Sequence, residues 1–207
     1  MAVTFDLFDT LVRVERPDSP AAAVAGALAA RGISVPDDWE SAYREPHADV
    51  KPTEEVSLPA HVSAALNSRG IDAPESAVRD AVEAAFEPTV ETVPGAESAV
   101  ESAAAAGATG VCSNCAVPGL ATRALEGSDI DSDAFDAVVT SVGVGWRKPD
   151  ERIFAAAADA LHCEVADLTH VGDDPETDGG IDAAGGQSII IESGDFEAVH
   201  ECLEGVA

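Results

Sequence analysis

The stretch VTFDLFDTLV, from Val3 to Val12, opens the chain with an apolar run that carries two acidic residues, Asp6 and Asp9. A carboxylate inside an apolar segment loses its hydration, and this loss is unfavourable unless another group compensates for the charge. A metal ion or a catalytic site would provide that compensation. The partners of these two acids should therefore be found elsewhere in the chain.

The chain has 207 residues, enough for one large domain or for a core with a smaller insertion. Hydrophobic residues make up 46% of the sequence, which supports a buried core and argues against disorder. No run approaches the roughly 18 apolar residues of a membrane span. The first residues lack the basic segment of a signal peptide. We expect a cytoplasmic protein.

The charge is strongly negative, because 11 basic residues stand against 39 acidic ones and give a net charge of −28. Such a surface repels nucleic acids and anionic membranes, so neither is an expected partner. The expected oligomeric state is a monomer or a homodimer. Acidic surfaces with almost no lysine resemble those of halophilic proteins, where salt screens the self-repulsion. The two lysines are Lys51 and Lys148, and each invites a specific role.

Five short apolar runs, most of them followed by a helical pattern, predict the strands of one sheet. The runs are continuous rather than alternating, which is typical of strands buried on both faces of a parallel sheet. Strands and helices in alternation indicate an α/β fold, here a three-layer, Rossmann-like core. The predicted strands are Val3–Phe8, Thr109–Ser113, Ala137–Ser141, Leu168–Gly172 and Ser188–Glu192. The predicted helices are Ala96–Ala106, Pro118–Glu126, Asp150–His162, Ile181–Ala184 and Phe196–Gly205.

One segment breaks this alternation and predicts a small inserted helical domain. It shows no convincing strand, and Pro36, Pro59 and Pro74 stand at plausible helix starts, where a missing N–H costs nothing. We therefore expect a core of residues 1–13 and 93–207 and a helical insertion of residues 14–92. The helices predicted in the insertion are Ala21–Arg31, Asp37–Arg44, Pro59–Arg69 and Pro74–Phe86.

Polar residues follow four of the predicted strands, at the edge where ligands bind in an open parallel sheet. Several carboxylates at one point repel each other and need a cation, and Mg²⁺ is the candidate that carboxylate, water and phosphate oxygens bind. A serine and a lysine at the same edge can hold phosphoryl oxygens, and a carboxylate can act as a nucleophile. The residues in question are Asp6, Thr10, Ser113, Asn114, Lys148, Asp173, Asp174 and Asp178.

Four motifs in this order resemble those of the haloacid dehalogenase-like (HAD) hydrolase superfamily. They are FDLFDTLV from Phe5, VCSNC from Val111, KPDERIF from Lys148 and HVGDDPETD from His170. The resemblance extends over nearly the whole chain, and the predicted helical insertion matches the helical cap of that family. It implies a hydrolase with a Rossmann-like core and a cap that sets specificity.

The resemblance also implies a role for each matching residue. Asp6 would be the nucleophile that forms a covalent aspartyl intermediate, and Lys148 would neutralise Asp6 and the transferred group. Ser113, with the backbone of Asn114, would bind the phosphoryl or leaving group. Thr10 would close the turn after the nucleophile.

A Mg²⁺ site is implied in the same way. The ion would be held by Asp6, by Asp173 and by the main-chain oxygen of Phe8. Asp178, or alternatively Asp174, would complete the shell, directly or through water.

Position 8 departs from the phosphatase pattern of the family, D-x-D-x-T, in which the second Asp protonates the leaving oxygen. Phe8 cannot donate a proton, and such acid catalysis is worth about 10²–10⁴-fold in rate. The branch of the family that cleaves carbon–halogen bonds also lacks this Asp, and a halide needs no proton to leave. Phe8 therefore favours a dehalogenase, or a protein that has lost catalysis.

The acids of the fourth motif favour a phosphatase instead. Dehalogenases dispense with Mg²⁺ and lack the acidic pair there, whereas this chain has Asp173, Asp174 and Asp178. One lysine would compensate these acids and Asp6 poorly without a cation. We therefore expect a Mg²⁺-dependent phosphatase of a small phosphorylated metabolite. The alternatives are a metal-independent 2-haloacid dehalogenase and a non-catalytic protein of this fold.

Other candidates have less specific interpretations. Arg44 lies near the loop of the insertion and is a candidate for binding an anionic substrate, but an ordinary surface position explains it as well. Cys112 and Cys115 have the spacing of a redox pair or half a zinc site, and packing of free thiols is the simpler interpretation. His170, inside a predicted strand, is interpreted as a structural histidine. Asp9 is interpreted as a residue that caps the turn, and the alternative is that it protonates the leaving group.

Overall fold

The computed structural model describes residues 1–192 and 194–204. Within these residues, five parallel strands form one sheet in the order β5-β4-β1-β6-β7. The first strand therefore lies in the centre, which is the most buried position in the sheet. The strands are β1 (Ala2–Phe5), β4 (Ala108–Ser113), β5 (Ala137–Thr140), β6 (Leu168–Gly172) and β7 (Gln187–Ile190).

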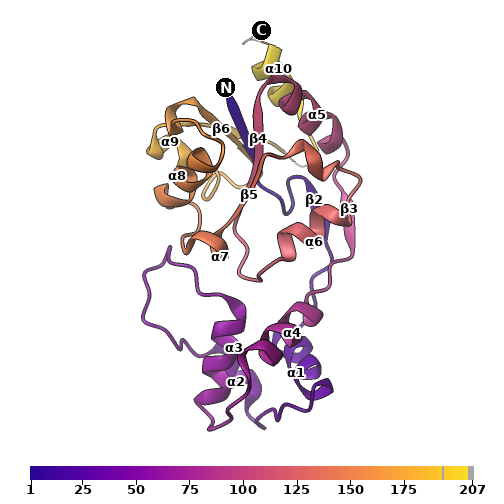
Figure 1. The fold of residues 1–207 in the computed structure, drawn as a ribbon, viewed down its shortest axis with the longest axis vertical. Helices are drawn as coiled ribbons and strands as arrows, with labels where there is room; N and C mark the ends of the chain where they lie inside the picture. Colours follow the sequence, from indigo (N-terminus) through magenta and orange to yellow (C-terminus); the bar gives the residue numbers. More distant parts are fainter. Residues whose placement is uncertain (193, 205–207) are drawn as a thin grey trace.

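Helices cover both faces of this sheet and make it a three-layer α/β core (Figure 1). On one face, Val3 and Phe5 pack with residues of α5, α6 and α10. On the other, Ala2 packs with residues of α8 and α9. Successive side chains of a strand point to opposite faces, so both faces are apolar. The helices are α5 (Ala96–Ala106), α6 (Leu120–Glu126), α7 (Ser141–Val144), α8 (Glu151–Ala160), α9 (Gly180–Ala184) and α10 (Glu197–Glu204).

Four helices between β2 and β3 form a second cluster at the opposite end of the molecule, here called the helical unit (Figure 1). They share a hydrophobic cluster that includes Val24, Leu28, Val62 and Val78 and extends to Cys115 and Val117 after β4. Ser57 caps the third helix by accepting the N–H of Ala60. The four helices are α1 (Pro20–Ala30), α2 (Trp39–Arg44), α3 (Leu58–Asn67) and α4 (Glu75–Ala85).

The expectation that no strand lies between the first strand and Val93 was wrong. Two short strands, β2 (Val12–Val14) and β3 (Val90–Thr92), pair in antiparallel fashion where the chain leaves the core and returns to it. Each has three residues, too few for an alternating pattern to stand out. Their pairing holds together the two segments of chain that connect the core to the helical unit.

The other expected elements form close to their predicted limits. The predicted helix Ala96–Ala106 and the predicted strand Leu168–Gly172 match α5 and β6 residue for residue. The first strand is shorter than expected and ends at Phe5, so Asp6 begins the loop. The predicted last helix extended to Gly205, which lies outside the described residues. Among the helices described, none combines the length and apolar character needed to cross a membrane.

Candidate active site

The carboxyl ends of the three central strands bring the predicted residues together. Asp6 follows β1, and its N–H donates to the main-chain oxygen of Val171 in β6 at 2.8 Å. Ser113 is the last residue of β4, and Asp173 follows β6. Because β1 lies between β4 and β6, its end is the point where loops from both neighbours meet.

Lys148 is buried in the middle of this group. Its Nζ lies 2.9 Å from Oδ1 of Asp6 and 2.5 Å from Oδ1 of Asp178, and only 1% of its side chain is exposed. Burial alone would lower the pKa of Lys148, but the carboxylates of Asp6 and Asp178 outweigh it and raise this pKa well above its ordinary value. The lysine is therefore a fixed positive charge at neutral pH.

Asp178 is fully buried and hydrogen-bonded at both carboxylate oxygens. Oδ1 accepts from Lys148 and lies 3.1 Å from Nε2 of His170, while Oδ2 accepts the N–H of Asp174 at 3.0 Å. Burial raises the pKa of Asp178, but the hydrogen bond from His170 and the charge of Lys148 outweigh this and leave the pKa far below its ordinary value. A Cβ at position 172 would collide with this carboxylate, so Gly172 leaves the room that it needs.

His170 supports this network from inside β6. Its Nδ1 lies 3.0 Å from Oγ1 of Thr4, and its ring packs edge-on against Phe154. Burial, together with the charge of Lys148, lowers the pKa of His170, so the ring is neutral. A neutral ring that donates from Nε2 to Asp178 accepts from Thr4 at Nδ1. The histidine has the structural place expected from the sequence, but its link to Asp178 had no sequence signal.

Asp173 completes a cluster of three acids. One carboxylate oxygen from each of Asp6, Asp173 and Asp178 lies within 4.8 Å of the others. Thr10 donates its hydroxyl to Oδ1 of Asp173 at 2.7 Å. Burial raises the pKa of Asp173, and the charges of Asp6 and Asp178 raise it further. The hydrogen bond from Thr10 opposes this effect without cancelling it. Three carboxylates face one buried ammonium, so the cluster has the charge and the oxygen donors that suit a divalent cation.

The side chains of Ser113 and Asn114 differ in whether they already have hydrogen-bond partners. The Ser113 hydroxyl is buried and has no hydrogen-bond partner among the described residues, so it is available for a ligand. The Asn114 side chain is engaged with the backbone of Lys148: its Oδ1 accepts from the Lys148 N–H at 2.7 Å and its Nδ2 donates to the Lys148 oxygen at 3.1 Å. Asn114 therefore joins two of the loops that carry the site.

Asp9 lies in the turn after β1, outside the acid cluster. Its φ of 68° is left-handed, a conformation that Asp tolerates better than most residues. Its N–H donates to the main-chain oxygen of Val12 at 2.7 Å, and its carboxylate pairs with Arg16 at 2.7 Å. Both side chains of this pair are at least half exposed. The interpretation of Asp9 as a turn residue fits this geometry.

A loop of the helical unit is hydrogen-bonded to the core beside Lys148. The Arg147 N–H donates to the main-chain oxygen of Thr53 at 2.9 Å, and the Thr53 hydroxyl donates to Oδ2 of Asp150 at 2.7 Å. Glu55 accepts the hydroxyl of Ser141 at 2.6 Å. The loop between α2 and α3, which reaches toward α7 in Figure 1, thus holds the segment that carries Lys148.

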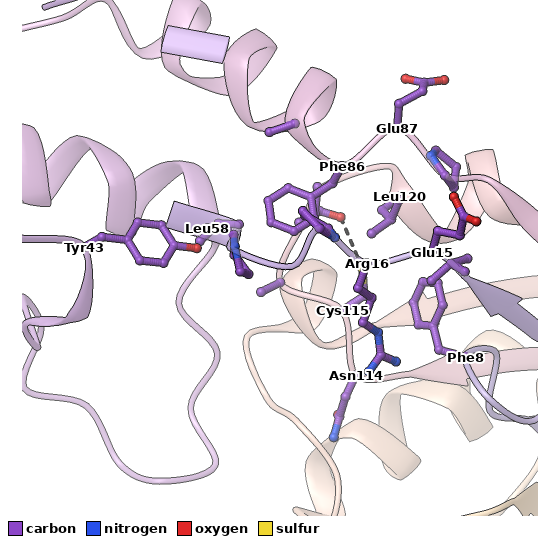
Figure 2. A pocket seen from close by; sticks show the side chains of 17 residues that line it. Phe8, Glu15, Arg16, Tyr43, Leu58, Phe86, Glu87, Asn114, Cys115 and Leu120 are labelled. Carbon is purple, nitrogen blue, oxygen red and sulfur yellow. Dashed lines mark hydrogen bonds between the residues drawn. The ribbon is translucent and has the colours of Figure 1, made fainter. Parts of the chain in front are cut away.

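A pocket of about 380 Å³ lies between the core and the helical unit (Figure 2). Tyr43, Leu58 and Phe86 reach it from the helical unit, and Phe8 and Leu120 reach it from the core. Phe8 lies two residues from Asp6 in the chain. The pocket had no recognisable signal in the sequence, because its walls come from segments far apart along the chain.

Arg44 does not line this pocket. It lies on α2 with 73% of its side chain exposed and pairs with Glu40 one turn earlier. The cysteines of the C-x-x-C pair are buried and free, and burial raises the pKa of Cys112 to about 12. Cys115 has a raised pKa for the same reason. Such thiols are inert, as expected for packing.

A model of the haloacid dehalogenase-like hydrolases matches residues 1–185. The chain belongs to this family. HAD hydrolases commonly use a divalent metal, and the described residues of this chain include a cluster of three acids that could hold one. No curated protein matches the sequence of this HAD-like hydrolase.

Among the solved structures of the same fold, one is named as a dehalogenase and two others hold magnesium or phosphate. A 2-haloacid dehalogenase from Pseudomonas syringae pv. Tomato DC3000 is 26% identical, with a TM-score of 0.66 over 91% of this chain and 85% of its own. The putative HAD-hydrolase YfnB from Bacillus subtilis, bound to magnesium, is 19% identical, with a TM-score of 0.55 over 98% of each chain. CbbY from Rhodobacter sphaeroides, in complex with phosphate, is 18% identical, with a TM-score of 0.59 over 91% of this chain and 84% of its own. The last two likenesses concern the fold alone.

Proposed function

We propose that this HAD-like hydrolase is a Mg²⁺-dependent phosphatase of a small phosphorylated metabolite. The acid cluster carries the proposal. Asp6, Asp173 and Asp178 bring three negative charges to one point, and the described residues around them provide one buried ammonium, that of Lys148. His170 adds no charge, because burial keeps its ring neutral. A divalent cation would balance the remaining charge, and a dehalogenase has no need of one.

The acids of the cluster would have different roles in binding Mg²⁺. Both oxygens of Asp178 already accept hydrogen bonds, so its main contribution is to hold Lys148. Asp6 and Asp173, with the main-chain oxygen of Phe8, are the proposed direct ligands, and Asp178 or Asp174 would complete the shell through water. The bound ion would neutralise these acids and the phosphoryl oxygens.

In the proposed reaction, a carboxylate oxygen of Asp6 attacks phosphorus and the bond from phosphorus to the leaving oxygen breaks. Lys148 orients Asp6 and offsets its charge, and the free hydroxyl of Ser113, with the N–H of Asn114, binds phosphoryl oxygens. Water then hydrolyses the aspartyl phosphate, which releases phosphate and restores Asp6. The helical unit acts as the cap that closes over the substrate. Arg44 remains a candidate for substrate contact only if α2 moves.

Dehalogenation is the second candidate, and two observations favour it. Phe8 has no proton to donate, and the structure with a TM-score of 0.66 belongs to a protein named as a 2-haloacid dehalogenase. In that reaction Asp6 would attack carbon and displace a halide, with no metal.

The test compares both reactions in one chloride-free buffer of molar potassium acetate, because one of the two readouts is released chloride. Wild-type protein is assayed for p-nitrophenol release from p-nitrophenyl phosphate and for chloride release from 2-chloropropionate, each with Mg²⁺ and with EDTA. The proposal predicts phosphate hydrolysis that EDTA abolishes. Asp6→Asn should lose it, while Asp9→Asn, the same change in the exposed turn, should keep it nearly unchanged. Chloride release that persists in EDTA would replace the phosphatase with the dehalogenase.

A further inference from the structure

We infer that the substrate of this site is the phosphate monoester of a phenol, whose ring lies in the pocket between the core and the helical unit. The inference rests on the proposed phosphatase function and names its substrate class. Three observations carry it: the chemistry of the pocket wall, the charges at its rim and the phenylalanine at position 8, where the phosphatase pattern has its proton donor.

The wall of the pocket suits a flat apolar group. Phe8 and Leu120 from the core and Tyr43, Leu58 and Phe86 from the helical unit surround about 380 Å³, near the lower end of the range for small-molecule sites (Figure 2). Aromatic side chains favour another ring through stacked or edge-on contacts. Asn114, the neighbour of Ser113, also lines the pocket, so the pocket adjoins the proposed phosphoryl site.

The rim of the pocket disfavours a second anionic group on the substrate. Arg16 is the cation among the described residues that line it, and it already pairs with Asp9 at 2.7 Å. Glu15 and Glu87 line the same pocket and add negative charge. A leaving group with a further phosphate or carboxylate would be repelled. A neutral ring would not.

The carboxyl groups that line the pocket are those of Glu15 and Glu87, and neither stands at position 8, where the phosphatase pattern has its proton donor. Phe8 has no proton to give, and Lys148 is held as an ammonium between Asp6 and Asp178. Thr10 already donates its hydroxyl to Asp173. Tyr43 is the neutral hydroxyl donor that lines the pocket, and it is tested below.

A phenol removes the need for an acid. When Asp6 bonds to phosphorus, the bond from phosphorus to the aryl oxygen breaks and the oxygen keeps the electron pair. The phenolate formed is the base of an acid with a pKa of about 10, as for Tyr. An alkoxide is closer to hydroxide, whose conjugate acid has a pKa of about 15.7. Solvent protonates the phenolate after it leaves.

Three matched esters separate ring recognition from the leaving group. Phenyl phosphate has a ring and a phenolate leaving group, benzyl phosphate has a ring and an alkoxide, and cyclohexyl phosphate has the size of a ring and an alkoxide. With Mg²⁺ in molar KCl, kcat/KM for phenyl phosphate should exceed that for the other two by about 100-fold or more, because acid catalysis is worth about 10²–10⁴-fold. Benzyl phosphate should compete with phenyl phosphate, whereas cyclohexyl phosphate should compete less well.

Three variants test the residues. Phe86→Ala should raise KM for phenyl phosphate about 10-fold and leave acetyl phosphate, which has no ring, unchanged. Phe8→Asp should raise kcat for benzyl phosphate. The ratio of kcat/KM for phenyl phosphate to kcat/KM for benzyl phosphate should therefore fall. Tyr43→Phe should leave that ratio unchanged.

Equal kcat/KM values for the three esters would overturn the inference and leave the phosphatase in place. A Phe86→Ala variant that affects both phenyl and acetyl phosphate equally, or a Tyr43→Phe variant that loses benzyl phosphate hydrolysis selectively, would overturn it too. Failure to hydrolyse any of the four compounds would overturn the phosphatase function itself and this inference with it.

Discussion

Nζ of Lys148 lies 2.5 Å from Oδ1 of Asp178, and neither side chain is exposed by more than 1%. This buried pair holds the ammonium 2.9 Å from Asp6. A buried ion pair adds little net stability, but removing one partner leaves a buried charge without compensation. The pair therefore fixes the geometry of the site more than it stabilises the fold.

The two lysines of the chain provide a matched pair of substitutions. Lys148→Met should abolish hydrolysis and lower the free energy of unfolding by about 3–5 kcal/mol, because it leaves Asp6 and Asp178 without their cation. Lys51→Met removes the other lysine, which is exposed, and should change neither the rate of hydrolysis nor the free energy of unfolding. Urea denaturation and phosphate release measure both effects. Equal free energies of unfolding for the two variants would contradict the role of Lys148 in compensating the charges of Asp6 and Asp178.

A methyl group at position 172 should disturb the site. Gly172→Ala would place its Cβ against the carboxylate of Asp178, which has no room to retreat because both of its oxygens are bonded. We expect at least a 10-fold loss of kcat together with lower stability. Gly26→Ala, inside α1 with nothing within 4 Å of the new Cβ, should be neutral or more stable, by about 0.5–1 kcal/mol.

The contact between Thr53 and Asp150 should affect the rate more than the stability. Thr53→Val removes a 2.7 Å hydrogen bond that ties the loop of the helical unit to the Lys148 segment. We expect kcat to fall several-fold, because Lys148 becomes less well positioned, and Thr53→Ser to restore it. Steady-state kinetics of the two variants test this. A loss that Ser fails to rescue would show that the hydroxyl is not responsible.

The C-x-x-C cysteines should resist modification. Burial raises the pKa of Cys112 to about 12, so at pH 8 almost none of it is the reactive thiolate. The half-buried Cys163 and Cys202 should react with a thiol reagent first in the native protein, and all four should react after denaturation. Rapid modification of Cys112 and Cys115 in the folded protein would revive the redox interpretation.

Much of the core was predictable because its signals are local. A continuous apolar run defines each buried strand, and the residues that follow those strands must meet at one edge of the sheet. The strands β2 and β3 were missed because three residues carry no periodicity and because Val12 pairs with Thr92, far away in the sequence.

The candidate site was predictable as a list of residues, but not as a network. Nothing local shows that His170 and Asp174 would engage Asp178, or that the Asn114 side chain would hold the Lys148 backbone. These contacts depend on how the loops that follow β4, β5 and β6 meet at the edge of the sheet. The pocket depends on the approach of Phe86 to Phe8 across two units, which no short segment encodes.

The most direct test of the central claim, a divalent-cation site built on Asp6 and Asp173, is thermal unfolding with and without Mg²⁺ in molar KCl, which screens the acidic surface. A ligand that binds only the folded state stabilises it by about 2.7 kcal/mol at 100 times its Kd. We predict that Mg²⁺ raises the Tm of wild type and of Asp9→Asn, in the exposed turn outside the cluster, but not that of Asp173→Asn. An equal response of Asp173→Asn and wild type, or no response of wild type, would contradict the claim.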